Sequence, residues 1–324
     1  DRKDVSVKMK TVLVLLPVEQ RHKELLEAAA PGWEFLYTPA SKVAGGQLAR
    51  ANVIIGNLPA YRLPQCPALE WMQLNSAGAE AYCKPGVLGP QVLLTNASGA
   101  YGLAIAEHMV GVTLMMMKNL HIYRDHQRDA LWQNEGRVAS IWGSTFLILG
   151  LGDIGGEFAR RVRLLGGKAV GLRRTPGDCP DWLDGLYTME KLDELLPRAD
   201  VVAMSLPGTP QTAGIMDRRR LGLMKPSAYL INVGRGNAVD TDALLQALEG
   251  GRLAGAALDV VEPEPLPPDH PLWACPRAVI TPHAAGKFNL PETFERIVRI
   301  SAENLAAYHQ GRPLRNLVNR KSGY

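Results

Sequence analysis

Residues 145–155 read TFLILGLGDIG, in which an apolar run leads directly into a glycine-rich turn. The run is typical of a buried strand, and residues 157–165 continue as a helix. Between a strand and a helix, such glycines permit a tight turn and bring backbone N–H groups close to a pyrophosphate at the helix N-terminus. We therefore predict a dinucleotide site, with a purely structural glycine turn as the alternative. Its predicted members are Gly150, Gly152, Asp153, Ile154 and Gly155.

The next predicted strand, at residues 168–173, ends in basic residues. A site for NAD normally has an acidic residue there, which holds the hydroxyls of the adenosine ribose. No acid occurs between Glu157 and Asp178, and the strand end instead carries Arg173, Arg174 and Thr175. Because a guanidinium offers planar, bidentate hydrogen bonding to phosphate oxygens, these residues favour the 2′-phosphate of NADP, with NAD still possible. The alternative is a pair of solvated arginines.

Similar apolar runs recur along the whole chain and alternate with helical patterns, which is typical of an α/β protein. Further strands are predicted at 11–17, 33–37, 52–56, 71–74, 92–95, 201–206, 228–233, 255–260 and 278–281. We predict a Rossmann domain with a doubly wound parallel sheet in residues 101–290. A smaller α/β domain is predicted in residues 1–100 and 291–324, and the family resemblance described below implies that it is flavodoxin-like and binds substrate. A final helix at 292–310 would return the chain to this smaller domain.

The stretch from Gly102 to Leu120 predicts a long helix that is apolar on almost every side. It includes three consecutive methionines, Met115 to Met117. A helix without a polar face needs a covering surface all around it. We therefore predict that it is buried against a second copy of the chain as well as against its own domain, which makes a homodimer. Burial within one subunit is the alternative.

The overall composition argues against several classes of protein. The net charge is only +4, and no run of five or six like charges occurs, so we expect no nucleic-acid partner. No apolar stretch is long enough for a signal peptide or a membrane span, so we expect a cytoplasmic protein without a membrane partner. The cysteines lack the spacing of metal ligands, which predicts free thiols and no metal site. They are Cys66, Cys83, Cys179 and Cys275.

Polar residues of three kinds follow three of the later strands. Arg235, Glu264 and His283 each come shortly after the end of a different predicted strand. Ligands of open α/β sheets bind beyond the carboxyl ends of the strands. A fixed cation holds an anionic substrate, an imidazole transfers a proton near neutral pH, and a carboxylate tunes that imidazole. We therefore predict that these three residues are catalytic.

Five motifs in order resemble the D-isomer-specific 2-hydroxyacid dehydrogenase family, which includes phosphoglycerate dehydrogenase and glyoxylate/hydroxypyruvate reductase. The resemblance covers nearly the whole chain. The motifs are GLGDIG at 150–155, SLPGTPQT at 205–212, INVGRG at 231–236, LDVVEPEP at 258–265 and ITPH at 280–283.

The resemblance implies that hydride from NADPH reduces a small 2-oxo acid, such as glyoxylate or hydroxypyruvate, to a D-2-hydroxy acid. Arg235 would hold the substrate carboxylate and polarise its ketone, and His283 would protonate the ketone oxygen. Glu264 would orient His283 and stabilise its cation. In the family pattern, the spacing from Asp259 selects Glu264, and Glu262 is more in keeping with a surface charge.

The resemblance also implies two further groups of binding residues. Cofactor contacts would come from Ser205, Leu206, Pro207, Thr212, Val233, Asp259 and His283. Substrate contacts would come from Arg235, from the small residues Ser76, Ala77 and Gly78, whose backbone N–H groups would hold the carboxylate, and from Tyr101. A core or hinge tyrosine is the alternative for Tyr101. The other histidines are expected to be structural or exposed: His22, His108, His121, His126, His270 and His309.

Two departures from the family pattern and two other functions stay open. The stretch 286–289 differs from the commoner small and threonine-containing pattern, which leaves the pocket wall undefined. The chain ends at Tyr324 without a regulatory extension, so we do not expect an amino-acid-regulated phosphoglycerate dehydrogenase. The alternatives are a nucleotide-sensing scaffold similar to the transcriptional corepressors of this fold, and an NAD-dependent dehydrogenase of another substrate such as phosphite.

Overall fold

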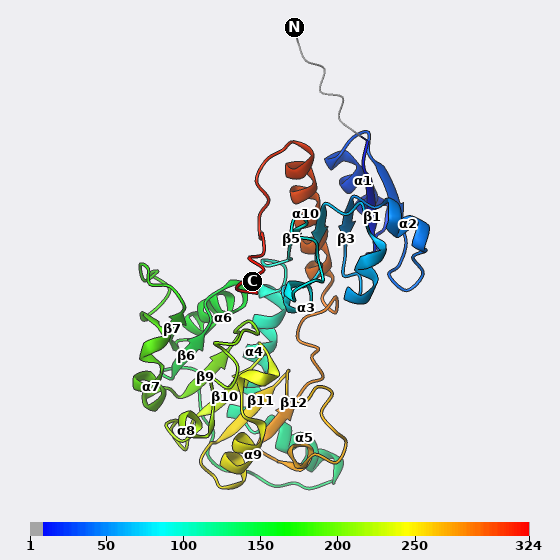
Figure 1. Ribbon diagram of the computed structural model, residues 1–324. Helices are drawn as coiled ribbons and strands as arrows, with labels where there is room; N and C mark the ends of the chain where they lie inside the picture. Colours follow the sequence, from blue (N-terminus) through cyan, green and yellow to red (C-terminus); the bar gives the residue numbers. More distant parts are fainter. Residues whose placement is uncertain (1–8, 324) are drawn as a thin grey trace. The chain divides into compact units, whose positions relative to one another are not determined.

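The computed structural model describes residues 9–323. The expectation that the chain begins without a leader peptide concerns residues 1–8, which lie outside this range. Contacts between residues divide the chain into two compact units (Figure 1). The first comprises the chain up to Ala100 together with the chain from Pro291 onward, and the second runs from Tyr101 to Leu290.

The second unit contains a seven-stranded parallel sheet in the order β12-β11-β10-β9-β6-β7-β8. The order runs outward in both directions from β6, as in a Rossmann fold, so the predicted doubly wound sheet is confirmed. Its central strands are buried along almost their whole length, because helices cover both faces of such a sheet. The strands are β6 Thr145–Leu149, β7 Lys168–Arg173, β8 Gly185–Thr188, β9 Val201–Met204, β10 Tyr229–Asn232, β11 Gly255–Leu258 and β12 Ala278–Ile280.

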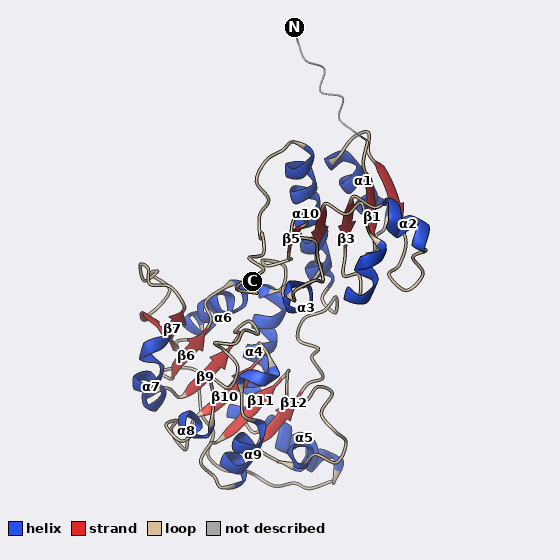
Figure 2. Ribbon diagram, viewed as in Figure 1, coloured by secondary structure: helices blue, strands red, loops and turns tan. Residues whose placement is uncertain are grey.

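Helices lie on both faces of this sheet (Figure 2). On one face, α4 packs against α6 and β11, and on the other, α8 packs against α9. The residue before α9, Asp240, caps the helix by accepting a hydrogen bond from the Ala243 N–H at 2.9 Å. The helices are α4 Gly102–Met117, α5 Leu120–Arg128, α6 Asp153–Leu164, α7 Leu192–Leu195, α8 Arg218–Leu221 and α9 Thr241–Glu249.

The first unit contains a five-stranded parallel sheet in the order β2-β1-β3-β4-β5. This is the strand order of flavodoxin-like folds, so the predicted architecture of the smaller unit is confirmed. Helix α10 packs against α1, and Val318 continues along the edge strand, where its N–H donates to the carbonyl of Leu94. The elements are β1 Thr11–Val14, α1 Gln20–Ala29, β2 Glu34–Tyr37, α2 Gly45–Arg50, β3 Val53–Ile55, β4 Trp71–Gln73, α3 Glu80–Cys83, β5 Leu93–Thr95 and α10 Pro291–His309.

Several predicted strands are shorter in the structure, such as β1, which ends at Val14, and two further differences have a clear physical reason. Strand β8 was not predicted, because its four residues lie at a sheet edge and are only partly buried, which removes the apolar run that marks a central strand. The predicted helix at 102–120 is wrong at its end, since α4 stops at Met117. Asn119 adopts a left-handed conformation (φ 56°), which an α-helix cannot accommodate, and α5 begins after it.

Candidate active site

The candidate residues of the second unit lie just past the carboxyl ends of the strands of one sheet. Since all seven strands are parallel, these ends meet at a single edge (Figure 1). The strand order reverses between β6 and β9, which is where open α/β sheets bind their ligands. The segments that follow the strands are 150–155 after β6, 173–175 after β7, 205–212 after β9, 233–235 after β10, 259–264 after β11 and 281–283 after β12.

The turn after β6 requires its glycines. Gly150 has a φ of +92°, a conformation that residues with side chains rarely adopt. A Cβ on Gly155 would lie 1.9 Å from the Gly150 carbonyl oxygen, so no larger residue fits there. The Ser205 hydroxyl donates to the same oxygen at 3.0 Å and ties the end of β9 to the turn. The first turn of α6, which includes Ile154, therefore starts close to the strand with its N–H groups directed outward.

Asp153 has a structural partner that the motif did not indicate. Its Oδ2 accepts a hydrogen bond from the Gly102 N–H at 2.7 Å. A Cβ on Gly102 would lie 2.2 Å from the other carboxylate oxygen, so the close contact depends on glycine. The carboxylate of Asp153 thus holds the first residue of α4.

Arg173, at the end of β7, has a buried group without a partner. Among the described residues, no atom accepts a hydrogen bond from its Nε. The guanidinium lies across Gly177, where a Cβ would be only 1.4 Å from Nη2. Arg174 and Thr175 follow it and are exposed. A buried cationic donor that lacks an acceptor fits an anionic ligand group at this strand end.

The loop after β9 is shaped by its own hydrogen bonds. The Thr212 hydroxyl donates to the Pro207 carbonyl at 2.6 Å and accepts from the Thr209 N–H at 2.9 Å. Leu206 and Val233 are buried beside it. Because both hydrogen bonds of the Thr212 hydroxyl go to the loop itself, this side chain fixes the conformation of the loop. Thr212 would therefore support a cofactor through the backbone that it positions.

The backbone of Arg235 is clamped between two loops. A Cβ on Gly234 would lie 2.6 Å from the Leu206 carbonyl oxygen, and one on Gly236 would lie 1.9 Å from the Val261 carbonyl oxygen. Buried Asn232 closes the turn, because its Nδ2 donates to the Arg235 carbonyl at 2.9 Å and its Oδ1 accepts from the Gly234 N–H. Both glycines and the asparagine therefore fix the backbone position from which the half-buried side chain of Arg235 extends.

His283 and Glu264 form a direct pair. His283 Nδ1 lies 2.7 Å from Glu264 Oε1, and both side chains are about half exposed. The other glutamate, Glu262, uses its backbone carbonyl to accept from the Thr241 hydroxyl at 2.9 Å. Since Nδ1 faces a carboxylate, it carries the proton of the neutral imidazole there, and Nε2 is left for a ligand. The structure therefore brings together the imidazole and the carboxylate of the predicted trio.

Asp259 anchors the loop that carries His283. Asp259 is buried, with 4% of its surface exposed. Oδ1 accepts from the Thr281 hydroxyl at 2.6 Å, from the Ala284 N–H at 2.8 Å and from the Ala285 N–H at 3.1 Å. The Asp259 carbonyl accepts from the His283 N–H at 2.8 Å. His283 has a φ of +51°, so these bonds hold it in a conformation that a residue with a side chain adopts only when its surroundings enforce it.

In the first unit, the loop that contains Ser76, Ala77 and Gly78 presents unpaired donors. Its carbonyls are all engaged: Ser76 accepts from the Ala97 N–H, Ala77 from Asn96 Nδ2 and Gly78 from the Ser76 hydroxyl. Among residues 9–323, none accepts a hydrogen bond from the N–H groups of residues 76–78. A row of free N–H groups forms a concave site for an anion.

Tyr101 lies directly before α4 and is buried. Its ring lies against Gly286, where a Cβ would be 3.3 Å from the ring edge. Burial raises the pKa of its hydroxyl well above the usual value for tyrosine. The ring therefore supports the stretch after His283, which is the segment that departs from the commoner family pattern.

Comparison with known proteins identifies the family. The model of the D-isomer specific 2-hydroxyacid dehydrogenase NAD-binding domain matches residues 110–285, which is more than half of the chain. The chain belongs to this family. Members of the D-2-hydroxyacid dehydrogenase family are NAD(P)-dependent oxidoreductases of small 2-oxo and 2-hydroxy acids, and the described geometry has the corresponding dinucleotide-type turn.

Individual relatives are similar over most of their length. A glyoxylate reductase from Thermofilum pendens is 32% identical over 276 residues, which are 83% of this chain and 80% of that protein. A family member from Aeromonas salmonicida subsp. salmonicida has a crystal structure that matches with a TM-score of 0.85 at 32% identity, over 96% of this chain and 99% of that one. The NADPH-dependent glyoxylate/hydroxypyruvate reductase from Sinorhizobium meliloti, solved with NADP and sulfate, matches with a TM-score of 0.82 at 25% identity, over 97% and 100%.

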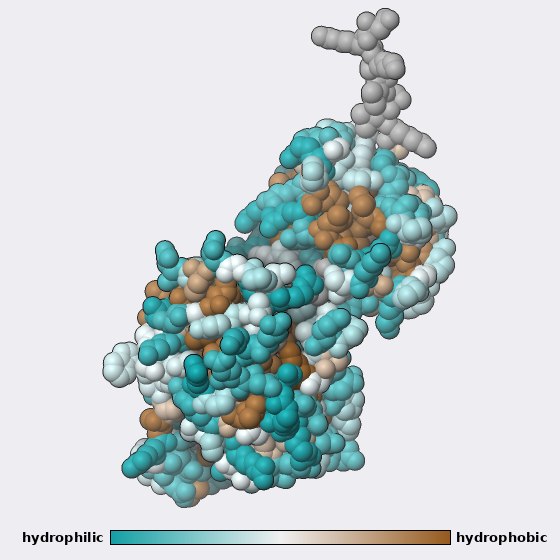
Figure 3. Space-filling view, turned by 60° about the vertical axis from the view of Figure 1, so that its left-hand side comes forward, coloured by the Kyte–Doolittle hydropathy of each residue, from teal (hydrophilic) through white to brown (hydrophobic). Residues whose placement is uncertain are grey.

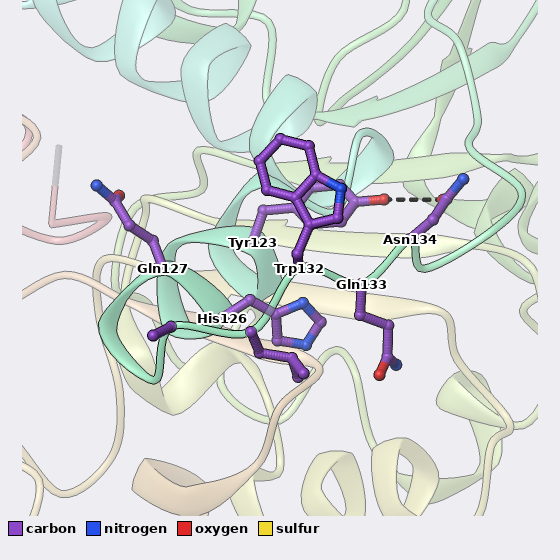
Figure 4. A pocket seen from close by; sticks show the side chains of 8 residues that line it. Tyr123, His126, Gln127, Trp132, Gln133 and Asn134 are labelled. Carbon is purple, nitrogen blue, oxygen red and sulfur yellow. Dashed lines mark hydrogen bonds between the residues drawn. The ribbon is translucent and has the colours of Figure 1, made fainter.

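Two cavities among the described residues lie away from the candidate catalytic residues. One has a volume of about 590 Å³ and is lined by residues 123–134 alone. Figure 4 shows Tyr123 there, whose hydroxyl donates to Asn134 at 3.2 Å. The other, of about 420 Å³, lies at the amino ends of β10 and β11, where Tyr229 and Gly255 begin those strands. Neither cavity includes a member of the predicted trio.

The surface and the described helices give two further findings. Figure 3 shows a largely hydrophilic face with separate brown patches. Within residues 9–323, no helix combines the length and apolar character that crossing a membrane requires. The same residues contain no group of three or more histidine, cysteine or acidic side chains arranged to hold a metal ion.

Sequence reasoning missed three residues that support the site. Asn232 and Thr281 stand inside the motifs INVGRG and ITPH, but only the structure shows what their side chains hold. His108 was expected to be structural or exposed. It is half-buried on α4, and its Nε2 lies 3.5 Å from the Thr281 hydroxyl. The signal available in the sequence was limited to the position of His108 directly after Glu107, which indicates nothing about a partner 173 residues away.

Proposed function

We propose that this protein is a D-2-hydroxyacid dehydrogenase that prefers NADP(H) and reduces small 2-oxo acids of the glyoxylate and hydroxypyruvate type. The observation that carries the proposal is the His283–Glu264 pair, which leaves one imidazole nitrogen for a ligand at the sheet edge where Arg235 is clamped. The glyoxylate reductase from Thermofilum pendens and the reductase from Sinorhizobium meliloti support the substrate class.

The residues after β6 and β7 fit the cofactor. The turn at Gly150 and Gly155 brings the start of α6 close to a pyrophosphate, where helix N–H groups favour negative charge. Arg173 would hold the 2′-phosphate of the adenosine ribose with its buried, unpartnered Nε, and Arg174 and Thr175 would complete that end. When bound, NADPH supplies the hydride that reaches the carbonyl carbon of the substrate.

The protein's own groups supply positioning and the proton. Arg235 would hold the carboxylate of the oxo acid and polarise its ketone through charge-assisted hydrogen bonds. In its protonated, imidazolium form His283 would release the proton on Nε2 to the ketone oxygen, which leaves the neutral ring with its proton on Nδ1, where Glu264 keeps it oriented. The unpaired N–H groups of residues 76–78 suit the substrate carboxylate as well. Asp259 and Tyr101 would act by shaping the segment around His283.

Replacing Arg173 tests the cofactor preference. Arg173→Asp should lower kcat/KM for NADPH by about 10- to 100-fold, because a hydrogen bond to a charged group contributes roughly 1.5–3 kcal/mol. The value for NADH should stay constant or rise. Arg198→Asp makes the same change of charge at an exposed residue and should leave the preference unaltered. If the wild type already favours NADH, the phosphate-site assignment is wrong.

A substrate panel tests the function itself. The purified protein should oxidise NADPH in the presence of glyoxylate or hydroxypyruvate faster than with bulkier 2-oxo acids, and the product should have the D configuration. Phosphite with NAD belongs in the same panel. Binding of NADPH without turnover of any acid would favour the nucleotide-sensing scaffold, and turnover of phosphite would favour the other alternative.

We also propose a homodimer. The outward face of α4 carries Leu103, Val110 and Leu114, which are only partly buried, and the segment after α5 exposes the full surface of Trp132. A second copy of the chain would remove this apolar surface from water. Light scattering at micromolar concentration should give twice the mass of one chain. Trp132→Arg together with Leu114→Arg should shift that mass toward the monomer, and a wild type of monomer mass contradicts the proposal.

A further inference from the structure

A chain of polar contacts lies beneath the loop that carries His283. It begins at His108 on α4, passes through the hydroxyl of Thr281 and ends at the buried carboxylate of Asp259. Asp259 Oδ1 in turn accepts from the N–H groups of Ala284 and Ala285, the two residues after His283. The contacts therefore connect a helix on one face of the sheet with the backbone of the proton donor.

The direction of each contact follows from what each atom offers. A threonine hydroxyl has one proton, and Thr281 uses it toward Asp259 at 2.6 Å. Its oxygen is then left as an acceptor, so His108 Nε2, at 3.5 Å, takes the role of donor. Burial lowers the pKa of His108, and the Asp259 carboxylate opposes this less strongly. The neutral ring with its proton on Nε2 suits the arrangement.

We propose that His108 is a positioning residue for the reduction: it holds the Thr281 hydroxyl toward Asp259 and so keeps His283 in its left-handed conformation. The inference rests on the proposed function, because His283 is the proton donor of that reaction. His108 itself needs no contact with substrate or cofactor. Its effect reaches the reaction through the Asp259 bonds, which hold a backbone conformation that a histidine rarely adopts alone.

The test compares His108→Leu with His108→Gln. Leucine fills the space but removes the donor, and the glutamine amide restores an N–H near Nε2. His108→Leu should lower kcat by about 10- to 100-fold, since misplacing a reacting group by about 1 Å costs on that order. The KM for NADPH should stay close to that of the wild type. His108→Gln should recover most of kcat, which a role in packing alone does not explain.

A double-mutant cycle locates the effect. Thr281→Val removes the hydroxyl that joins His108 to Asp259 and should lower kcat in the same way. Because the two side chains act in one chain of contacts, the double variant with His108→Leu should lose no more than Thr281→Val alone. Additive losses in kcat would overturn the proposal. His309→Leu, at another half-buried histidine on a helix, is the matched control and should leave kcat unchanged.

Hydrogen exchange provides a readout that does not depend on turnover. The amides of His283, Ala284 and Ala285 are bonded to Asp259, so they should exchange faster in His108→Leu than in the wild type and at the wild-type rate in His108→Gln. Equal exchange in all three proteins would overturn the inference. A wild type that reduces no 2-oxo acid would overturn the proposed function, and the exchange result would still decide the role of His108.

Discussion

His283→Ala is expected to lower kcat for 2-oxo acid reduction by about 10²- to 10⁴-fold, the range that a positioned acid or base contributes. The dissociation constant for NADPH should change little, because proton delivery is needed only in the transition state. The imidazole pairs with Glu264 through Nδ1 at 2.7 Å, so Nε2 is the atom whose loss should cause the effect. Steady-state kinetics and fluorescence titration with NADPH measure the two quantities separately.

The control for this variant is His309→Ala. His309 lies at the end of α10 and contacts the ring of Trp33, so its loss should leave kcat at the wild-type value. Near-normal turnover in His283→Ala would show that the acid lies elsewhere. A large rise in the NADPH dissociation constant would instead indicate that the substitution disturbs the cofactor site.

Replacing Arg235 should raise KM for the oxo acid and lower kcat together. We expect Arg235→Ala to reduce kcat/KM by about 10²- to 10³-fold or more, as for the loss of one preorganised donor to a developing oxyanion. The same guanidinium would bind the carboxylate in the ground state and the charge that grows on the ketone oxygen. Arg235→Lys keeps the charge but loses the planar pair of donors, so it should recover only part of the loss.

Because the backbone at residue 235 is held by its neighbours, the effects of these variants can be assigned to the side chain of Arg235. Gly234, Gly236 and Asn232 fix the main chain at residue 235 whatever side chain stands there, so the variants should keep the fold of the loop. Arg252→Ala, at an exposed position, is the matched control. An Arg235→Ala enzyme with normal KM and reduced kcat would remove the ground-state role, and one with unchanged kcat/KM would contradict both roles.

The sequence allowed most of the fold to be predicted because its signals are local. Buried parallel strands produce continuous apolar runs, and every strand of the second unit except β8 carries one. The glycine turn at 150–155 has a conformation that few other sequences adopt, so its place between strand and helix could be read directly. The ends of helices and strands were harder to predict, as Asn119 shows, because a single left-handed residue separates α4 from α5.

The candidate residues could be predicted to share one edge, since the carboxyl ends of parallel strands meet. Their partners could not. The pairing of Glu264 with His283 came from a family spacing, whereas the structure gives it as a 2.7 Å contact between side chains 19 residues apart. Asp153 was predicted to bind the cofactor, and the motif does not indicate that its carboxylate also accepts a hydrogen bond from the Gly102 N–H, 51 residues earlier.

What the sequence by itself determined is the position of most strands along the chain, the phosphate-type turn and the chemical types at the strand ends, because each depends on neighbouring residues in the chain. What only the tertiary structure decided is which polar groups meet: Asp259 with Thr281 and the His283 loop, and His108 with Thr281. The physical reason is that a hydrogen bond depends on distance and direction in space. The helix that carries His108 meets the loop of His283 only when α4 has packed against the sheet.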